Sequence, residues 1–186
     1  MTEKEKILIV VDMQHDFVDG SLGTPEAQAI VPKIEEKIRN GKYDKILYTF
    51  DTHDSSYFNT MEGKKLPVKH CALGTHGWSS ALDCSFDDKN MVIKQTFGYP
   101  TWERYIDVDT KSTGWFSSDH KSNVDSIELC GVCTDICVIA NALLLKTKLP
   151  EVQILIDASC CAGTTPEAHK AALTVMKSCQ IDVINE

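Results

Sequence analysis

The alternation of short apolar runs with amphipathic stretches constrains the fold of this chain more than any other feature. The runs are almost continuously apolar and rich in Ile, Val and Leu, which is typical of strands buried on both faces of a sheet. Six strands are predicted, at residues 7–11, 45–49, 91–93, 126–130, 152–156 and 181–184. Amphipathic helices are predicted at residues 27–39, 135–146 and 166–177. This order of elements predicts an α/β fold with three layers, α/β/α, around a six-stranded, mostly parallel sheet.

Length and composition indicate one ordinary globular unit. A chain of 186 residues, with 42% hydrophobic and 25% charged residues, is long enough to bury a substantial core. We therefore expect a single domain over residues 1–186. The apolar runs are much shorter than the roughly 20 residues that cross a membrane, and the first residues lack the apolar region of a signal peptide. A cytoplasmic protein without a membrane partner is expected.

Charge and cysteine content exclude further classes of protein. The net charge is −8 at pH 7 and no stripe of Lys and Arg occurs, which argues against a nucleic-acid partner. The glycine motifs of standard nucleotide-binding sites are absent as well. The eight cysteines occur in a chain that has no export signal and enough residues for a core, so reduced thiols are expected rather than a disulfide framework.

Chemically active side chains follow the predicted strands at their carboxyl ends, which is where sheets of this type bind ligands. Asp12 follows the first strand, Asp51 the second and Lys94 the third. Taken singly, Asp12 is equally compatible with a helix cap, and Lys94 with a solvated strand end. Just past apolar strands, however, an unpaired charge is costly. Each of these charges is therefore expected to have a partner.

The fourth strand leads into a turn that suits a nucleophile. Gly131 permits a sharp turn, Thr134 or Asp135 can cap the following helix, and Cys137 then lies in the first helical turn. Unpaired N–H groups and the helix dipole stabilise a thiolate there, and the same N–H groups suit an oxyanion hole. Taken alone, a cysteine at this place is more often a small apolar residue that packs the helix against the sheet. With Asp12 as base and Lys94 as cation, the pattern favours a cysteine hydrolase.

Residues 52–79 form a stretch that is rich in His, Gly and Lys and is too long for a simple connection, so a functional loop is predicted. It carries His53, Glu62 and His70 and begins directly after Asp51. Two imidazoles and two carboxylates are a plausible ligand set for a divalent transition metal such as zinc. Taken singly, His53 and His70 are also compatible with exposed loop residues.

These motifs together resemble the isochorismatase-like cysteine hydrolases and, within them, the nicotinamidase group. The resemblance spans nearly the whole chain, through residues 10–17, Lys94, 131–138, 157–159 and 166–169. It implies that Cys137, rather than Cys133, is the nucleophile, with Asp12 and Lys94 as the other members of the triad. It also implies a cis peptide before Cys133 and an oxyanion hole made by the backbone N–H groups of Cys133 and Cys137.

The resemblance also implies a metal and a substrate. Asp51, His53 and His70 match the metal ligands of the group, and Glu62 takes the fourth place by analogy with members that use Glu. Zinc is the expected ion, with manganese or iron as alternatives. The implied reaction is the conversion of nicotinamide to nicotinate and ammonia through a thioester on Cys137, in NAD salvage. The resemblance further implies a homo-oligomer.

The expected wall around the substrate ring departs from the pattern of the group. The aromatic residue that commonly precedes the last metal histidine is absent, because residues 66–69 are Leu-Pro-Val-Lys. We expect Phe17, Tyr99 and Trp102 to supply the wall instead, with Leu66 as a further substrate contact. Phe17 and Trp102 are equally compatible with ordinary core aromatics.

Two other functions remain open from the sequence. One is hydrolysis of another small amide, ureide or carbamate by the same triad. The other is a thiol redox or metal-binding regulatory protein that uses Cys130 and Cys133, which have the C-x-x-C spacing of redox proteins and zinc sites. No second pair with this spacing occurs for a four-cysteine zinc site.

Overall fold

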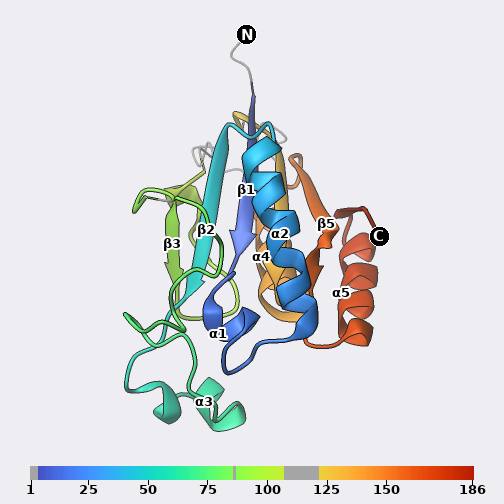
Figure 1. Ribbon diagram of the computed structural model, residues 1–186. Helices are drawn as coiled ribbons and strands as arrows, with labels where there is room; N and C mark the ends of the chain where they lie inside the picture. Colours follow the sequence, from blue (N-terminus) through green and yellow to red (C-terminus); the bar gives the residue numbers. More distant parts are fainter. Residues whose placement is uncertain (1–3, 86, 107–121) are drawn as a thin grey trace.

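A computed structural model of the chain describes residues 4–85, 87–106 and 122–186. Its strands form a single sheet in the order β3-β2-β1-β4-β5-β6, and every neighbouring pair is parallel. The strands are β1 (Glu5–Val11), β2 (Lys45–Asp51), β3 (Met91–Lys94), β4 (Val124–Val132), β5 (Gln153–Ala162) and β6 (Asp182–Ile184). The predicted α/β fold with a six-stranded sheet is confirmed (Figure 1).

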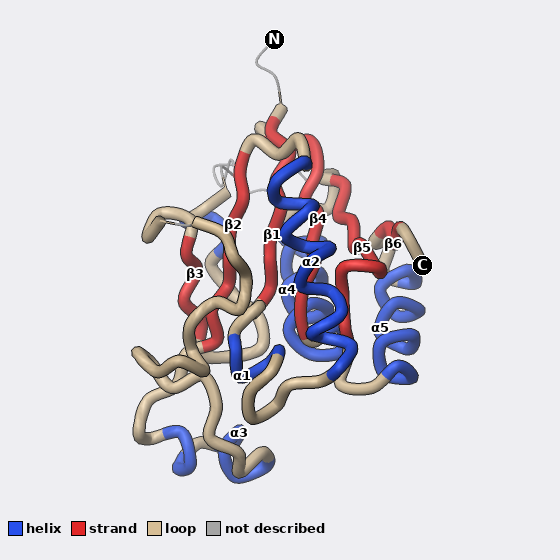
Figure 2. The backbone as a smooth tube through the Cα atoms, viewed as in Figure 1, coloured by secondary structure: helices blue, strands red, loops and turns tan. Residues whose placement is uncertain are grey.

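Helices cover both faces of the sheet. Helix α2 (Pro25–Asn40) crosses one face, over β4 and β5, while α4 (Ile139–Lys148) lies behind the sheet and contacts α5 (Pro166–Ser178), as Figure 2 shows. The shorter elements are α1 (His15–Val18), η1 (Tyr57–Asn59), α3 (Met61–Lys65), η2 (Trp102–Arg104) and the π-helical turn η3 (Thr134–Val138). None of the described helices is both long and apolar enough to cross a membrane.

Local sequence explains where the helices begin. The Thr24 side chain accepts a hydrogen bond from the Ala27 N–H at the start of α2, and the Thr165 side chain accepts one from Ala168 N–H at the start of α5. A proline follows each threonine at the first helical position, where its missing N–H has no intrahelical partner to lose. These two Thr-Pro pairs therefore fix the loops that precede α2 and α5.

The central strand β1 shows why the apolar runs are continuous. Its residues 7–11 are at most 1% exposed, because α2 covers one face and the elements behind the sheet cover the other. Strands β2 to β5 extend further toward their carboxyl ends than predicted, and β4 and β5 end at Val132 and Ala162. This edge of the sheet carries the polar side chains described below.

Candidate active site

The carboxyl ends of β1 to β4 bring together the side chains that were far apart in the sequence. Asp51 and Lys94 end β2 and β3 and are paired in register. Asp12 directly follows β1, and Cys137 lies in the turn η3 that follows β4. All four side chains are at most 7% exposed. The topology therefore assembles the predicted nucleophile, base and cation at one edge of the sheet.

Lys94 is the centre of this assembly. Its ammonium lies 2.7 Å from Asp12 Oδ2, 3.6 Å from Cys137 Sγ and 3.4 Å from Asp51 Oδ1. The Thr49 hydroxyl donates a 2.6 Å hydrogen bond to Asp12 Oδ1, which fixes the carboxylate. Asp12 itself adopts a left-handed backbone conformation, with φ of +49°, so its side chain turns out of the strand direction.

Burial dominates the electrostatics of the triad. Burial raises the pKa of Asp12 above its usual value, although the Lys94 charge acts to lower it. The pKa of the Cys137 thiol is raised well above normal by burial and by the charge of Asp12, again against Lys94. The Lys94 charge acts to lower the thiol pKa, but desolvation is the larger effect, so the thiolate expected at this helix start is not favoured. The geometry is that of a neutral thiol beside a carboxylate that can take its proton.

The turn between β4 and Cys137 depends on a glycine. Gly131 has φ of +118°, and a Cβ on it would lie 2.1 Å from the Val11 carbonyl oxygen of the neighbouring strand. Only glycine fits this close approach. The Val132–Cys133 peptide is cis, at the position implied by the family resemblance. Cys133 then precedes the first helical turn, which contains Cys137 and whose leading N–H groups have no partner within the helix.

The predicted capping of this helix is wrong. The N-cap residue is Cys133, and no side chain caps the turn. The Thr134 hydroxyl instead bonds His169 Nδ1 at 2.8 Å, and Asp135 accepts two hydrogen bonds from Thr164. Thr134 is drawn toward α5 and Asp135 toward the loop before α5, because both segments pack against the turn.

Four side chains of the predicted metal set also converge. The ligand atoms of Asp51, His53, Glu62 and His70 all lie within 4.8 Å of one another. His70 Nδ1 lies 2.8 Å from the Val68 carbonyl oxygen, which only accepts, so its Nε2 carries the free lone pair. His53 Nε2 is buried and lies 2.9 Å from Asp51 Oδ2 and 3.8 Å from Glu62 Oε1. This donor set fits a divalent transition metal.

The charges of this group also favour a cation. Burial acts to raise the pKa of Asp51, but the contacts with His53 and His70 and the charge of Lys94 hold it well below its usual range. The pKa of Glu62 is raised by burial and by repulsion from Asp51. Glu62 comes from α3, whose first turn is capped by the Thr60 side chain. A bound cation would relieve the repulsion between these two carboxylates.

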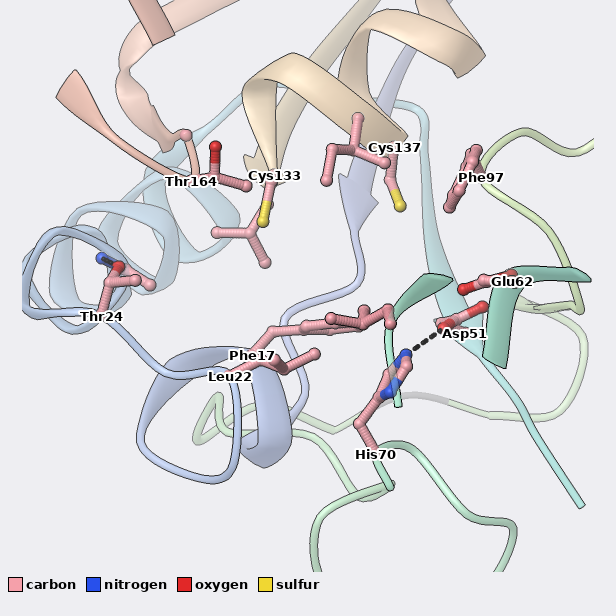
Figure 3. A pocket seen from close by; sticks show the side chains of 15 residues that line it. Phe17, Leu22, Thr24, Asp51, Glu62, His70, Phe97, Cys133, Cys137 and Thr164 are labelled. Atoms are coloured by element: carbon pink, nitrogen blue, oxygen red, sulfur yellow. Dashed lines mark hydrogen bonds and ion pairs between the residues drawn. The ribbon is translucent and has the colours of Figure 1, made fainter. Parts of the chain in front are cut away.

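One cavity of about 320 Å³ is lined by members of both groups, namely Cys137 of the triad and Asp51, Glu62 and His70 of the metal set. Phe17 and Leu66 line it, as expected, and the Phe17 ring lies 5.5 Å from that of His70 (Figure 3). Phe97 also lines it, on the side of Asp51 and Glu62. Sequence reasoning missed Phe97, although its place three residues after Lys94, beyond a strand end, was a usable signal.

Tyr99 and Trp102 do not line this cavity, so their expected contact with substrate is corrected. Trp102 is 1% exposed and packs in the core, with its ring 5.3 Å from that of Tyr99. The Tyr99 N–H donates to Asn141 Oδ1 of α4 at 2.8 Å. This bond holds the backbone at Tyr99 against α4, so the chain leaves the cavity after Phe97.

The cysteine pair of the redox alternative gains no support. All eight cysteines are free, which agrees with the expected reduced thiols. Cys130 is completely buried in β4, and burial raises its pKa well above normal. Reactive redox cysteines need access and a lowered pKa. Cys133 lines the cavity instead.

Comparisons with known proteins agree with this geometry. The isochorismatase domain model matches residues 6–186. The chain is 25% identical to a nicotinamidase of Saccharomyces cerevisiae, over 97% of this chain and 100% of that protein. It is 24% identical to a nicotinamidase/pyrazinamidase of Mycobacterium tuberculosis, over 96% and 98%. A crystal structure of a pyrazinamidase of Pyrococcus horikoshii in complex with zinc matches with a TM-score of 0.74 and 26% identity, over 98% of this chain and 99% of that chain. The chain therefore belongs to the isochorismatase family.

Proposed function

We propose that the protein is a nicotinamidase, a metal-dependent cysteine amidohydrolase that converts nicotinamide to nicotinate and ammonia. The observation that carries the proposal is the position of Lys94, whose ammonium contacts Asp12, the Cys137 thiol and the metal-ligand residue Asp51. One cavity therefore holds both a nucleophile and a place for a heteroaromatic ring. The relatives named nicotinamidase, which match nearly the whole chain, support the same reaction.

The proposed reaction begins with proton transfer from Cys137 to Asp12. The Cys137 sulfur attacks the carbonyl carbon, while the backbone N–H groups of Cys133 and Cys137 donate to the carbonyl oxygen. Asp12 then passes its proton to the departing nitrogen, the carbon–nitrogen bond breaks, and a thioester remains on Cys137. Water cleaves the thioester and releases the acid. A raised pKa suits Asp12 to this exchange, because a general base works best near the operating pH.

Asp51, His53, Glu62 and His70 would hold the metal, and zinc is the proposed ion, with manganese or iron as alternatives. A divalent cation there would provide an anchor for the nitrogen of a heteroaromatic ring. The zinc complex of the Pyrococcus horikoshii pyrazinamidase supports this choice. Phe17 and Leu66 would flank the ring, with Phe97 as a third wall.

The experiment that tests the proposal is ammonia release from nicotinamide, pyrazinamide and a non-aromatic amide, before and after chelation and readdition of zinc, manganese or iron. We expect metal-dependent release from the two aromatic amides and none from Cys137→Ala protein. Release that survives complete chelation would favour the alternative, hydrolysis of another small amide, ureide or carbamate by the same triad. Absence of release with every metal would refute the nicotinamidase proposal.

The proposal extends to the whole chain. Residues 1–186 would act as one domain, since all described strands belong to one sheet. We propose a cytoplasmic enzyme that acts as a homo-oligomer on a small amide, without a nucleic-acid partner. Light scattering of the purified protein measures the oligomeric state directly.

A further inference from the structure

The cavity is larger than a one-ring amide requires. Its volume of about 320 Å³ falls in the range of roughly 300–1,000 Å³ for pockets that bury drug-sized ligands. The nucleophile and the metal-ligand group share one end, because Lys94 contacts both Cys137 and Asp51. Phe17 lies at the same end, against His70. A pyridine carboxamide held there leaves the other end of the cavity empty.

That other end is a second compartment between the loop before α2 and the loop before α5. We call it the distal compartment, and it is lined by Leu22, Thr24, Ala27, Cys133, Ile136 and Thr164. In the view of Figure 3, Thr24, Cys133 and Thr164 lie on one side of Cys137, and Asp51, Glu62 and Phe97 lie on the other. The distal compartment therefore lies beyond the nucleophile as seen from the metal-ligand group.

The distal compartment is apolar because both of its hydroxyl groups are engaged elsewhere. Thr24 Oγ1 accepts from Ala27 N–H at 3.0 Å in the cap of α2. Thr164 Oγ1 donates to Asp135 Oδ2 at 2.6 Å, and the Thr164 N–H donates to Asp135 Oδ1 at 2.8 Å. The Thr164 hydroxyl thus points away from the cavity (Figure 3). What remains facing the space are methyl and methylene groups and the Cys133 side chain.

Asp135 holds this wall in place. A Cβ on Gly163, the residue before Thr164, would lie 2.9 Å from Asp135 Oδ1 and 2.8 Å from the backbone nitrogen of His169. The loop before α5 is therefore packed tightly on the Asp135 carboxylate, which belongs to the same turn as Cys137. The apolar wall and the nucleophile are fixed to each other.

We propose that the distal compartment binds an apolar group on the amide nitrogen of the substrate, so that the enzyme also hydrolyses N-alkyl heteroaromatic carboxamides. The inference rests on the proposed function, which places the ring at the metal-ligand group and the carbonyl carbon at Cys137. With the ring at the metal-ligand group and the carbonyl carbon at Cys137, a substituent on the amide nitrogen is the part of the substrate that can extend past Cys137 into the distal compartment. Asp12 passes the thiol proton to the departing alkylamine as the carbon–nitrogen bond breaks, and water then releases the acid from Cys137.

Binding to zinc-loaded Cys137→Ala protein tests the proposal without the complication of leaving-group reactivity. Calorimetry would compare nicotinamide, N-propylnicotinamide and an isomer with the propyl group on a ring carbon. We expect N-propylnicotinamide to bind roughly 10- to 50-fold more tightly than nicotinamide, from burial of three carbon groups. The ring isomer should gain no such affinity. Equal or weaker binding of N-propylnicotinamide, or a larger gain for the ring isomer, would overturn the proposal.

Variants of the lining locate the effect. Ala27→Leu narrows the distal compartment. It should reduce the affinity advantage of N-propylnicotinamide over nicotinamide by about tenfold. Thr164→Leu narrows it from the exposed rim and serves where Ala27→Leu fails to fold, since Ala27 is buried. Ala29→Leu, on the exposed side of the same helix, is the matched control and should leave the gain intact. If neither narrowing variant reduces the affinity advantage of N-propylnicotinamide, the propyl group does not bind in the distal compartment and the proposal is contradicted.

Hydrolysis by the unmutated enzyme completes the test, with nicotinate and propylamine as the products to be detected. Nicotinamide turnover without turnover of N-propylnicotinamide would refute this inference alone. Failure of both amides would refute the proposed function itself.

Discussion

Substitution of Lys37 should destabilise the protein strongly although the residue lies outside the active site. Its ammonium on α2 lies 2.5 Å from Glu128 Oε1 of β4 and 2.7 Å from Asp157 Oδ2 of β5. The three side chains are only 15%, 13% and 3% exposed. Lys37→Met keeps the aliphatic stem but leaves two poorly solvated carboxylates without their cation.

The expected loss is about 3 kcal/mol of unfolding free energy, the lower end of the range for breaking a buried pair. The lower end applies because each carboxylate keeps another donor: the Tyr43 hydroxyl on Glu128, and Ser159 on Asp157. Urea unfolding followed by tryptophan fluorescence should show a midpoint lower by about 1 M or more. Lys33→Met, on the exposed side of the same helix, is the control.

The loss of unfolding free energy in Lys37→Met should become smaller as the pH falls. Burial acts to raise the pKa of Asp157, but Lys37 and Ser159 hold it below its usual value. A carboxyl group of this kind stabilises the fold above its unfolded pKa of about 3.9, and this contribution is lost as the pH falls through the folded pKa. The difference between the unmutated protein and Lys37→Met should therefore be full at pH 7 and shrink below about pH 4. A loss under 1 kcal/mol at pH 7, or one that grows on acidification, would refute the reasoning.

Three further predictions concern the site. Cys137→Ala should lower kcat by roughly 10⁴-fold or more. Cys133→Ala should retain turnover, because the variant keeps its backbone N–H. The reverse result would make Cys133 the nucleophile. Glu62→Gln should weaken zinc binding at least about tenfold in a competition with a chromophoric chelator, and unchanged affinity would remove Glu62 from the ligand set. Trp102→Phe should leave the KM for nicotinamide unchanged and Phe17→Ala should raise it; equal KM changes would contradict the cavity lining.

The sequence predicts the sheet because burial on both faces leaves a nearly continuous apolar run in the central strands. Residues 7–11 are continuously apolar and are covered on both faces, so the pattern and the environment correspond directly. The ends of β1, β2 and β3 were predictable to within two residues for the same reason, since a charged residue at the end of such a run marks the edge of the sheet. Asp12, Asp51, Lys94 and Cys137 therefore lie together, as their positions after four parallel strands require.

The directions of loop side chains were decided only by contacts between distant parts of the chain. Asn141 turns Tyr99 toward α4, and Thr164 draws Asp135 out of its predicted capping role. No local pattern records such partners, because each lies roughly thirty or more residues away. The sequence by itself determined the fold and the chemistry available at the sheet edge. Tertiary packing decided the rest: the burial that raises the pKa values of Asp12 and Cys137, and the distal compartment, whose walls come from three separate segments of the chain.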